Sequence, residues 1–194
     1  MDCKGKHIIL GSNSPRRKEL LAGLHIDFEV DVRNSFEEKY SPDTPHAVIP
    51  RLMSEGKSTG FHRPLSQNEI LITADTLVLC GDKVMGKPHS REEAYGMLSL
   101  LSDNLHQVIT AVTIRDCNRK ITASDTAHVH FKKLSPEEIN WYIDNCKPFD
   151  KAGAYGIQEW IGYIGIDRIE GSFFTIMGLP VHLVYSMLDE FINR

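Results

Sequence analysis

Two adjacent arginines follow a short polar turn near the start of the chain. The segment Ser12–Arg17 reads SNSPRR and comes directly after the apolar run His7–Gly11. Ser14 is a typical helix N-cap and proline suits the first helical position, so Arg16 and Arg17 fall in the first helical turn. Cations there oppose the helix macrodipole at a cost of about 0.3–1 kcal/mol each. A bound anion would remove that cost, so the pattern predicts a phosphate site; two solvated surface arginines are the alternative.

A single carboxylate interrupts the apolar run 70–80, whose first part, 70–76, predicts a buried strand. Burying a carboxylate is costly unless it is paired, hydrogen-bonded or bound to a metal. We expect Asp75 at the carboxyl end of this strand, where α/β sheets place their sites, as a general base or metal ligand with the Thr76 hydroxyl beside it. The alternative is an aspartate at a strand end that caps a neighbouring loop.

A third segment is rich in glycine and ends in an amide. Residues 150–158 read DKAGAYGIQ. Two glycines among small residues permit a ligand to approach the backbone closely. Gln158 carries both a donor and an acceptor, which suits recognition of the edge of a nucleobase. The alternative is an ordinary glycine-rich connection.

The elements that must position these residues alternate between helices and strands. We expect, in chain order, a strand over 7–11, a helix from Pro15, a polar loop over 34–50, a helix over about 51–61, a strand over 70–76, a hairpin over 77–85, a helix from Ser90 with a capping box to Glu93, paired strands over 107–115 and 120–132, a capped helix from Ser135, two strands over 163–169 and 172–176, and a last helix from Pro180. Because several strands are joined by hairpins, this order favours an α/β fold with a mixed central sheet flanked by helices.

Composition excludes several classes of protein. The chain has 194 residues and a formal net charge of −4, which suits one domain without general affinity for nucleic acid. Its four scattered cysteines form no CxxC pair, which argues against a zinc cluster and for a reducing compartment. Since no stretch reaches the length of a membrane span or a signal peptide, we expect a cytoplasmic protein without a membrane partner. A Walker-type phosphate loop is absent from the sequence.

Five motifs follow one another along the chain: Ser12–Arg17 with Glu19–Leu21, Ala74-Asp75-Thr76, Gly86-Lys87-Pro88, Lys151–Gln158 and Met177–Pro180. Together they resemble the Maf family of nucleoside triphosphate pyrophosphatases over nearly all of residues 1–194, as a single domain. The resemblance implies an elongated fold with a central cleft, like that of the inosine triphosphate pyrophosphatases. It also implies a homodimer that hydrolyses a nucleoside triphosphate to the monophosphate and pyrophosphate with Mg²⁺ or Mn²⁺.

The resemblance assigns binding roles to cationic residues. Ser12, Arg16 and Arg17 match the phosphate-binding opening motif, and Lys57 and Lys87 match lysines that would hold the triphosphate. Such groups would offset the charge repulsion that opposes attack by water on the α-phosphorus. Lys57 lies in an atypical helix segment, MSEGKS, in which a glycine costs about 1 kcal/mol relative to alanine.

The remaining assignments concern the metal, the water and the base. Asp75 matches the catalytic aspartate and would orient or deprotonate the water. Glu38 is the expected second metal ligand beside Asp75, with Glu37 as the alternative if the alignment shifts by one residue. Oxygen ligands of this kind suit Mg²⁺ or Mn²⁺. Thr76 and Gln158, with Arg16, match positions that discriminate between bases, and YGIQ resembles the branch acting on dTTP and UTP.

Two other functions remain open at this point. One is a pyrophosphatase for a purine or a modified nucleotide such as 7-methyl-GTP, which a panel of substrates would reveal. The other is a non-enzymatic regulator of cell division that senses a nucleotide, which would bind without turnover. A carboxylate beside the expected phosphates argues against the regulator, because a protein that only binds phosphate gains nothing from it.

Overall fold

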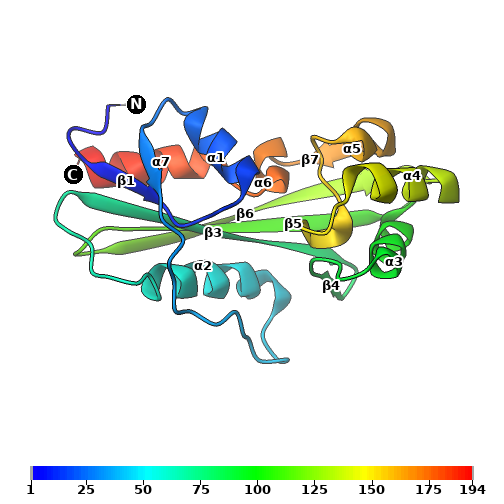
Figure 1. The fold of residues 1–194 in the computed structure, drawn as a ribbon, viewed down its shortest axis with the longest axis horizontal. Helices are drawn as coiled ribbons and strands as arrows, with labels where there is room; N and C mark the ends of the chain where they lie inside the picture. Colours follow the sequence, from blue (N-terminus) through cyan, green and yellow to red (C-terminus); the bar gives the residue numbers. More distant parts are fainter. Residues whose placement is uncertain (1, 194) are drawn as a thin grey trace. The chain divides into compact units, whose positions relative to one another are not determined.

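A seven-stranded sheet forms the centre of the fold (Figure 1) in the computed structural model, which describes residues 2–193. Its strands are β1 (His7–Leu10), β2 (Phe28–Val30), β3 (Glu69–Cys80), β4 (Lys83–Met85), β5 (Leu105–Arg115), β6 (Lys120–Phe131) and β7 (Ile166–Glu170). The strand order is β2-β1-β3-β5-β6-β7, and β4 pairs with β3. β1 is parallel to β2 and β3, whereas β4 and β7 are antiparallel to their partners, so the predicted mixed α/β sheet is confirmed.

Seven α-helices and two short 3₁₀ helices are described over residues 2–193. The helices are α1 (Pro15–Ala22), α2 (Ile49–Thr59), α3 (Arg91–Leu101), α4 (Pro136–Cys146), α5 (Trp160–Gly165), α6 (Phe173–Met177) and α7 (Val181–Asn193), with η1 (His46–Val48) and η2 (Ala152–Ala154). Figure 1 shows α1 and α7 on one side of β1 and α2 on the other. Within the described part of the chain, no helix is long and apolar enough to cross a membrane.

The chain, predicted as one domain, divides by its internal contacts into two compact units. Unit 1 comprises the residues up to Asp75, Thr110–Asp125 and the residues from Gly178 onward. Unit 2 comprises Thr76–Ile109 and Thr126–Met177. The strands β3, β5 and β6 therefore each contribute residues to both units.

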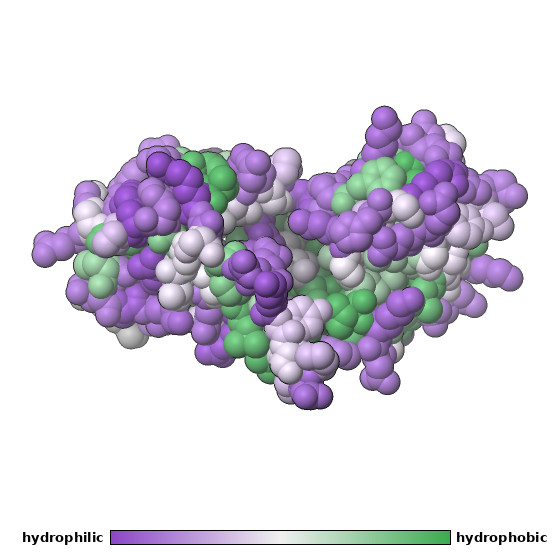
Figure 2. Space-filling model, turned by 60° about the horizontal axis from the view of Figure 1, so that its bottom comes forward, coloured by the Kyte–Doolittle hydropathy of each residue, from purple (hydrophilic) through white to green (hydrophobic). Residues whose placement is uncertain are grey.

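The core of unit 1 explains why its strands have almost continuously apolar sequences. Ile8, Ile9 and Leu10 of β1 are fully buried, as are the residues of β3 that pair with them. Parallel strands covered by helices on both faces bury every side chain, so no polar alternation survives in the sequence. The surface differs from this apolar core. On the face drawn in Figure 2 it is mainly hydrophilic, with smaller apolar areas.

Asp75 lies in the middle of a strand, so the prediction that it ends one was wrong. β3 continues through Thr76 to Cys80 because Val78, Leu79 and Cys80 pair with β4. The predicted strand and the first arm of the predicted hairpin are therefore one element. Asp75 is held on a rigid sheet rather than on a loop.

Several other elements differ from the predictions. Residues 173–177 form α6 and not a strand, and the predicted strand over 163–169 begins only at Ile166 because residues 160–165 form α5. A short apolar run does not distinguish the two states. α2 begins at Ile49 with a proline in its first turn. At α3, Ser90 accepts the Glu93 N–H at 3.1 Å, but the Glu93 carboxylate accepts from His89, so only half of the expected capping box forms. The box at the start of α4 is complete and that prediction is confirmed.

Candidate active site

The arginine turn folds as its sequence predicts. Ser14 caps α1 by accepting the Arg17 N–H at 3.5 Å, with a proline in the first turn. The Ser12 Oγ accepts the Ser14 N–H at 3.3 Å and closes the turn before the helix. Arg16 and Arg17 therefore lie in the first turn of a helix whose amide groups point toward the Ser12 turn.

The Arg17 side chain joins three of the sequence motifs within unit 1. Its Nε donates to the Gly178 carbonyl and its Nη1 to the Ala74 carbonyl, both at 2.8 Å, and Nη1 lies 3.4 Å from the Ser12 Oγ. Burial lowers the pKa of this guanidinium, and the charge of Asp75 opposes that shift. Arg17 thus fixes the Ser12 turn beside the strand that carries Asp75, a role that the motif alone did not indicate.

Asp75, Lys57 and Glu38 form a charged cluster in unit 1. The Lys57 Nζ lies 2.6 Å from the Asp75 Oδ1 and 2.9 Å from the Glu38 Oε1. The Asp75 and Lys57 side chains are 17% and 20% exposed, whereas Glu38 is 61% exposed. Glu37 pairs with Lys39 instead, so the structure brings Glu38 and not its neighbour to the cluster.

Matching periodicities on α2 and β3 place Lys57 opposite Asp75. The Ser54 Oγ donates to the Thr113 Oγ1 at 2.8 Å, and the Thr73 Oγ1 donates to the Ser54 carbonyl at 2.8 Å. Lys57 follows Ser54 by one helical turn, and Asp75 follows Thr73 by two residues on the same face of the strand. The buried hydroxyl contacts therefore align the helix so that the ammonium meets the carboxylate.

One glycine in α2 and one directly after it explain how the loop that carries Glu38 is held. The Phe36 ring packs so closely on Gly56 that a Cβ there would lie 2.2 Å from ring atoms. At Gly60 a Cβ would lie 2.7 Å from the Phe36 Cβ, and the Gly60 carbonyl accepts the Ser35 N–H at 2.9 Å. Gly56, whose low helix propensity weakens α2, thus makes room for the Phe36 ring. This contact holds the loop that carries Glu38.

The environment of Asp75 makes its carboxylate more basic. Burial raises its pKa, while the charges of Lys57 and Arg17 partly oppose the rise. A raised pKa favours proton uptake by this carboxylate, as a general base requires.

In unit 2, the segments that carry Lys87 and Gln158 lie against each other. The Gly153 N–H donates to the Gly86 carbonyl at 3.0 Å, and Lys87 itself is exposed. Gly153 has φ +69°, and a Cβ there would meet Val78 at 3.1 Å. The close approach that its glycine permits is therefore to β3 of the protein itself, which corrects the expectation that a ligand occupies that space.

Gln158 presents a buried acceptor. Its Oε1 is one of two buried side-chain polar atoms without a hydrogen-bond partner among the described residues; the other is the His106 Nδ1. Thr76, the other predicted base-discriminating residue of unit 2, is half-buried on β3. A buried amide oxygen without a partner costs free energy that a donor from a ligand would recover.

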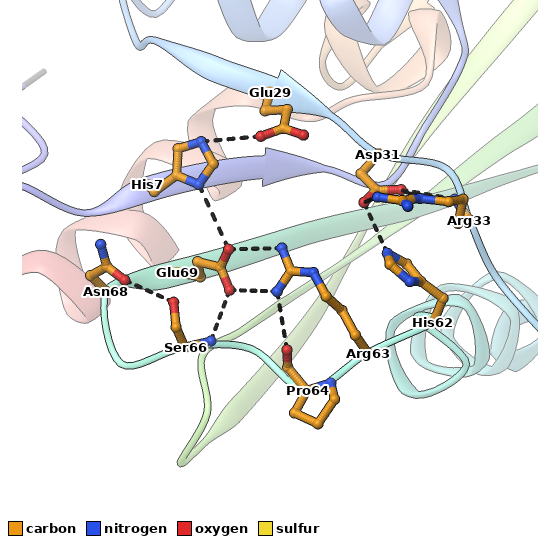
Figure 3. A network of polar contacts seen from close by, with 10 residues as sticks. All are labelled: His7, Glu29, Asp31, Arg33, His62, Arg63, Pro64, Ser66, Asn68 and Glu69. Atoms are coloured by element: carbon orange, nitrogen blue, oxygen red, sulfur yellow. Dashed lines mark hydrogen bonds and ion pairs between the residues drawn. The ribbon is translucent and has the colours of Figure 1, made fainter.

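Sequence reasoning missed a second network of charges in unit 1 (Figure 3). Arg63 binds both oxygens of Glu69 at 2.7 and 2.8 Å, and the Ser66 N–H adds a third hydrogen bond at 2.8 Å. Asp31 binds Arg33 at 2.6 Å. The contacts lower the pKa of Glu69 to about 2 and lower that of Asp31 as well. Arg33 lies two residues from Asp31, and Arg63 lies six residues from Glu69, so both pairs are local in the sequence. They were missed because isolated charges in a polar segment do not show which of them are buried and paired.

Known proteins resemble this chain over almost its whole length. Residues 7–191 match the family described as Maf-like protein. The chain is 51% identical over 184 residues to a protein of Parabacteroides distasonis named dTTP/UTP pyrophosphatase, covering 95% of each. It is 47% identical over 183 residues to a protein of Bacteroides thetaiotaomicron with the same name, covering 94% of this chain and 95% of the other.

A structural comparison gives a weaker likeness. The structure of a HAM1 protein from Coxiella burnetii matches with a TM-score of 0.41 and 12% sequence identity, covering 66% of this chain and 74% of that one. The family match and the similarity to the two named relatives extend over almost the whole sequence. The chain belongs to the Maf-like protein family.

Proposed function

We propose that this protein hydrolyses dTTP and UTP to the nucleoside monophosphate and pyrophosphate, as a house-cleaning enzyme of the nucleotide pool. The observation that carries the proposal is the half-buried Asp75 carboxylate, with a raised pKa, paired to Lys57 and held near the arginine turn. The names of the relatives support the choice of substrates.

The residues of unit 1 supply the phosphate chemistry in this proposal. Asp75 orients the attacking water and accepts its proton, which its raised pKa favours. The first-turn amides of α1, together with Ser12 and Arg16, bind phosphate oxygens, and Arg17 holds the turn in place. Lys57 offsets negative charge beside the carboxylate.

The donor set also fits a divalent cation. Two carboxylates, from Glu38 and Asp75, lie within 3 Å of one cationic atom, the Lys57 Nζ. Carboxylate oxygens, completed by water and substrate phosphate, are the ligands that Mg²⁺ and Mn²⁺ prefer. We therefore propose that Glu38 and Asp75 hold such an ion, which would neutralise charge on the phosphates.

The residues of unit 2 are proposed to bind the base and further phosphate charge. The Gln158 Oε1 is a buried acceptor, and thymine and uracil each present an N3–H donor flanked by carbonyl oxygens. The Gln158 amide would accept from N3–H and donate to an adjacent carbonyl. Thr76 would contribute to the same discrimination, and the exposed Lys87 would contact phosphate.

Pyrophosphate release from a substrate panel tests the proposal. The panel contains dTTP, UTP, CTP, GTP, ITP and 7-methyl-GTP, each with Mg²⁺ or Mn²⁺ and with chelator as control, for the wild type and Asp75→Asn. We expect turnover of dTTP and UTP that requires the metal and that the substitution removes. Turnover of a purine alone would overturn the role of Gln158, and nucleotide binding without any turnover would indicate a regulatory binder.

Two properties of the whole protein are also proposed here. A cytoplasmic location agrees with the four cysteines, none of which forms a disulfide in the described part of the chain. We propose a homodimer without a nucleic-acid or membrane partner, and the net charge of −4 supports the first exclusion. Sedimentation equilibrium at several concentrations measures the oligomeric state.

A further inference from the structure

A network of side chains, in which Tyr142 and Lys151 are buried and Glu159 is half-buried, holds the glycine-rich segment of unit 2 around Gln158. The Glu159 Oε1 lies 3.0 Å from the Lys151 Nζ, and its Oε2 accepts a hydrogen bond from the Tyr142 hydroxyl. The Tyr142 Oη in turn accepts the Gly156 N–H at 3.0 Å. Lys151 is 9% exposed in its side chain and Tyr142 is fully buried. Burial, followed by the hydrogen bond to Glu159, raises the pKa of Tyr142, so the hydroxyl keeps its proton.

The network binds the chain on both sides of Gln158. Gly156 precedes this residue by two positions, and Glu159 follows it directly. A Cβ at Gly156 would lie 2.9 Å from the Glu159 Cδ and 3.2 Å from the Gln158 Nε2. The amide of Gln158 is thus packed against the same glycine that the tyrosine hydroxyl holds.

The backbone before Gln158 requires such support. Gly153 and Ala154 both have positive φ, +69° and +59°, and Ala154 is fully buried. A non-glycine residue in this conformation stores strain, which persists only where surrounding contacts hold it. Buried ion pairs add little net stability compared with apolar packing, but they fix geometry. Apolar side chains would therefore fill this space at a lower cost in free energy than a lysine, a glutamate and a tyrosine. Filling space does not explain these three residue types.

We propose that Glu159 is a positioning residue that, through Tyr142 and Lys151, orients the Gln158 amide and so sets the selectivity of the enzyme among nucleobases. The inference rests on the proposed function, because it assigns the network to recognition of the base. Asp75, Lys57 and Glu38 do not participate in the network. Disrupting the network should therefore change substrate affinity and the discrimination between nucleobases much more than the rate of the chemical step.

The variant Glu159→Gln tests this inference, because it keeps the size of the side chain and removes its charge. We expect KM for dTTP and UTP to rise about tenfold with kcat within about twofold of wild type. The ratio of kcat/KM for dTTP to that for GTP should fall about tenfold. Tyr142→Phe should produce the same pattern, and the double variant should be no worse than the more severe single one, since the two groups act together.

Glu138→Gln is the matched control, because Glu138 also pairs with a lysine in unit 2, Lys132 at 3.2 Å. It should lower thermal stability without changing KM or selectivity. If Glu159→Gln and Glu138→Gln change the kinetics alike, or if Glu159→Gln leaves selectivity unchanged, the inference is overturned. Should Glu159→Gln fail to fold, Tyr142→Phe decides by the same criteria. A wild-type protein without turnover overturns the proposed function itself, which distinguishes the two failures.

Discussion

Two buried carboxylates on the same strand of unit 1 have opposite environments. Glu69, at the start of β3, receives hydrogen bonds from Arg63 on both oxygens and from a backbone amide, and its pKa falls to about 2. Asp75, six residues later, pairs with Lys57, yet burial raises its pKa. The number of ion pairs therefore does not distinguish a structural carboxylate from a reactive one.

The direction of the pKa shift makes that distinction. Glu69 is held so well as an anion that taking up a proton would break contacts across the start of the strand. Removing the Asp75 carboxylate from water costs more free energy than its charged partners recover. Protonation of Asp75 therefore lowers the free energy of the folded protein. A protein that keeps such a carboxylate sacrifices stability at that position, which is common at functional sites.

Replacing Asp75 should produce the largest effect on activity. In Asp75→Asn we expect turnover of dTTP to fall about 10²–10⁴-fold, the usual contribution of a general base. The melting temperature should stay the same or rise, because a buried charge is removed. Pyrophosphate release and thermal unfolding measure the two effects. Near-normal turnover in this variant would show that Asp75, like Glu69, is not a reactive carboxylate.

Removing the partner of Asp75 should sharpen the comparison through the pH profile. Lys57 lowers the pKa of Asp75, so Lys57→Met should raise it further. The acidic limb of kcat/KM against pH reports this pKa in the free enzyme and should move to higher pH, with activity at pH 7 reduced about tenfold. A profile with an unchanged acidic limb would mean that Asp75 is not the titrating base.

Glu69→Gln is the corresponding change in the structural network. It weakens hydrogen bonds to a charged group, and we expect a loss of about 1–2 kcal/mol in the free energy of unfolding. For a chain of this size, that loss lowers the melting temperature by about 2–8 °C. The kinetics with dTTP should remain those of the wild type. A clear loss of kcat would contradict the assignment of this network to stability alone.

The smallest effect concerns stability in acid. A carboxylate whose folded pKa is lowered stabilises the protein above its unfolded pKa, and that contribution disappears as the pH falls through the folded value. For Glu69 the loss should occur as the pH falls from about 4.5 toward 2. Denaturant titrations over this pH range should show that the free energy of unfolding falls less steeply with decreasing pH in Glu69→Gln than in wild type. Equal slopes would mean that Glu69 is not held as an anion.

The parts of the site that could be predicted from the sequence are those in which neighbours along the chain interact. The cap at Ser14 and the box at Ser135 depend on residues three positions apart, and both form. The Arg17 contacts with Ala74 and Gly178 join residues 57 and 161 positions apart, which no local pattern encodes. The pairing of β3 with β4 is a local hairpin and was predicted, but the continuity of its first arm with the strand that carries Asp75 was not.

The residues of the glycine-rich segment show a different limit. Gln158 was identified because its amide suits a base edge. Lys151 was noted only as the first residue of its motif, and Glu159 had no pattern that separated it from surface charges. Their importance arises from burial and from Tyr142, seventeen residues before Glu159 and on another helix. Function that depends on one side chain is easier to infer from sequence than the support that orients it.

The fit of Phe36 over Gly56 has a consequence for how such sequences change over time. An alanine at position 56 would collide with the ring, while a small residue at position 36 would leave a void over the glycine. Either single substitution therefore loosens the loop that carries Glu38, and the two positions are constrained to change together. Among natural variants of this protein, a large side chain at position 36 should coincide with glycine at position 56, and alanine at 56 should coincide with a smaller residue at 36.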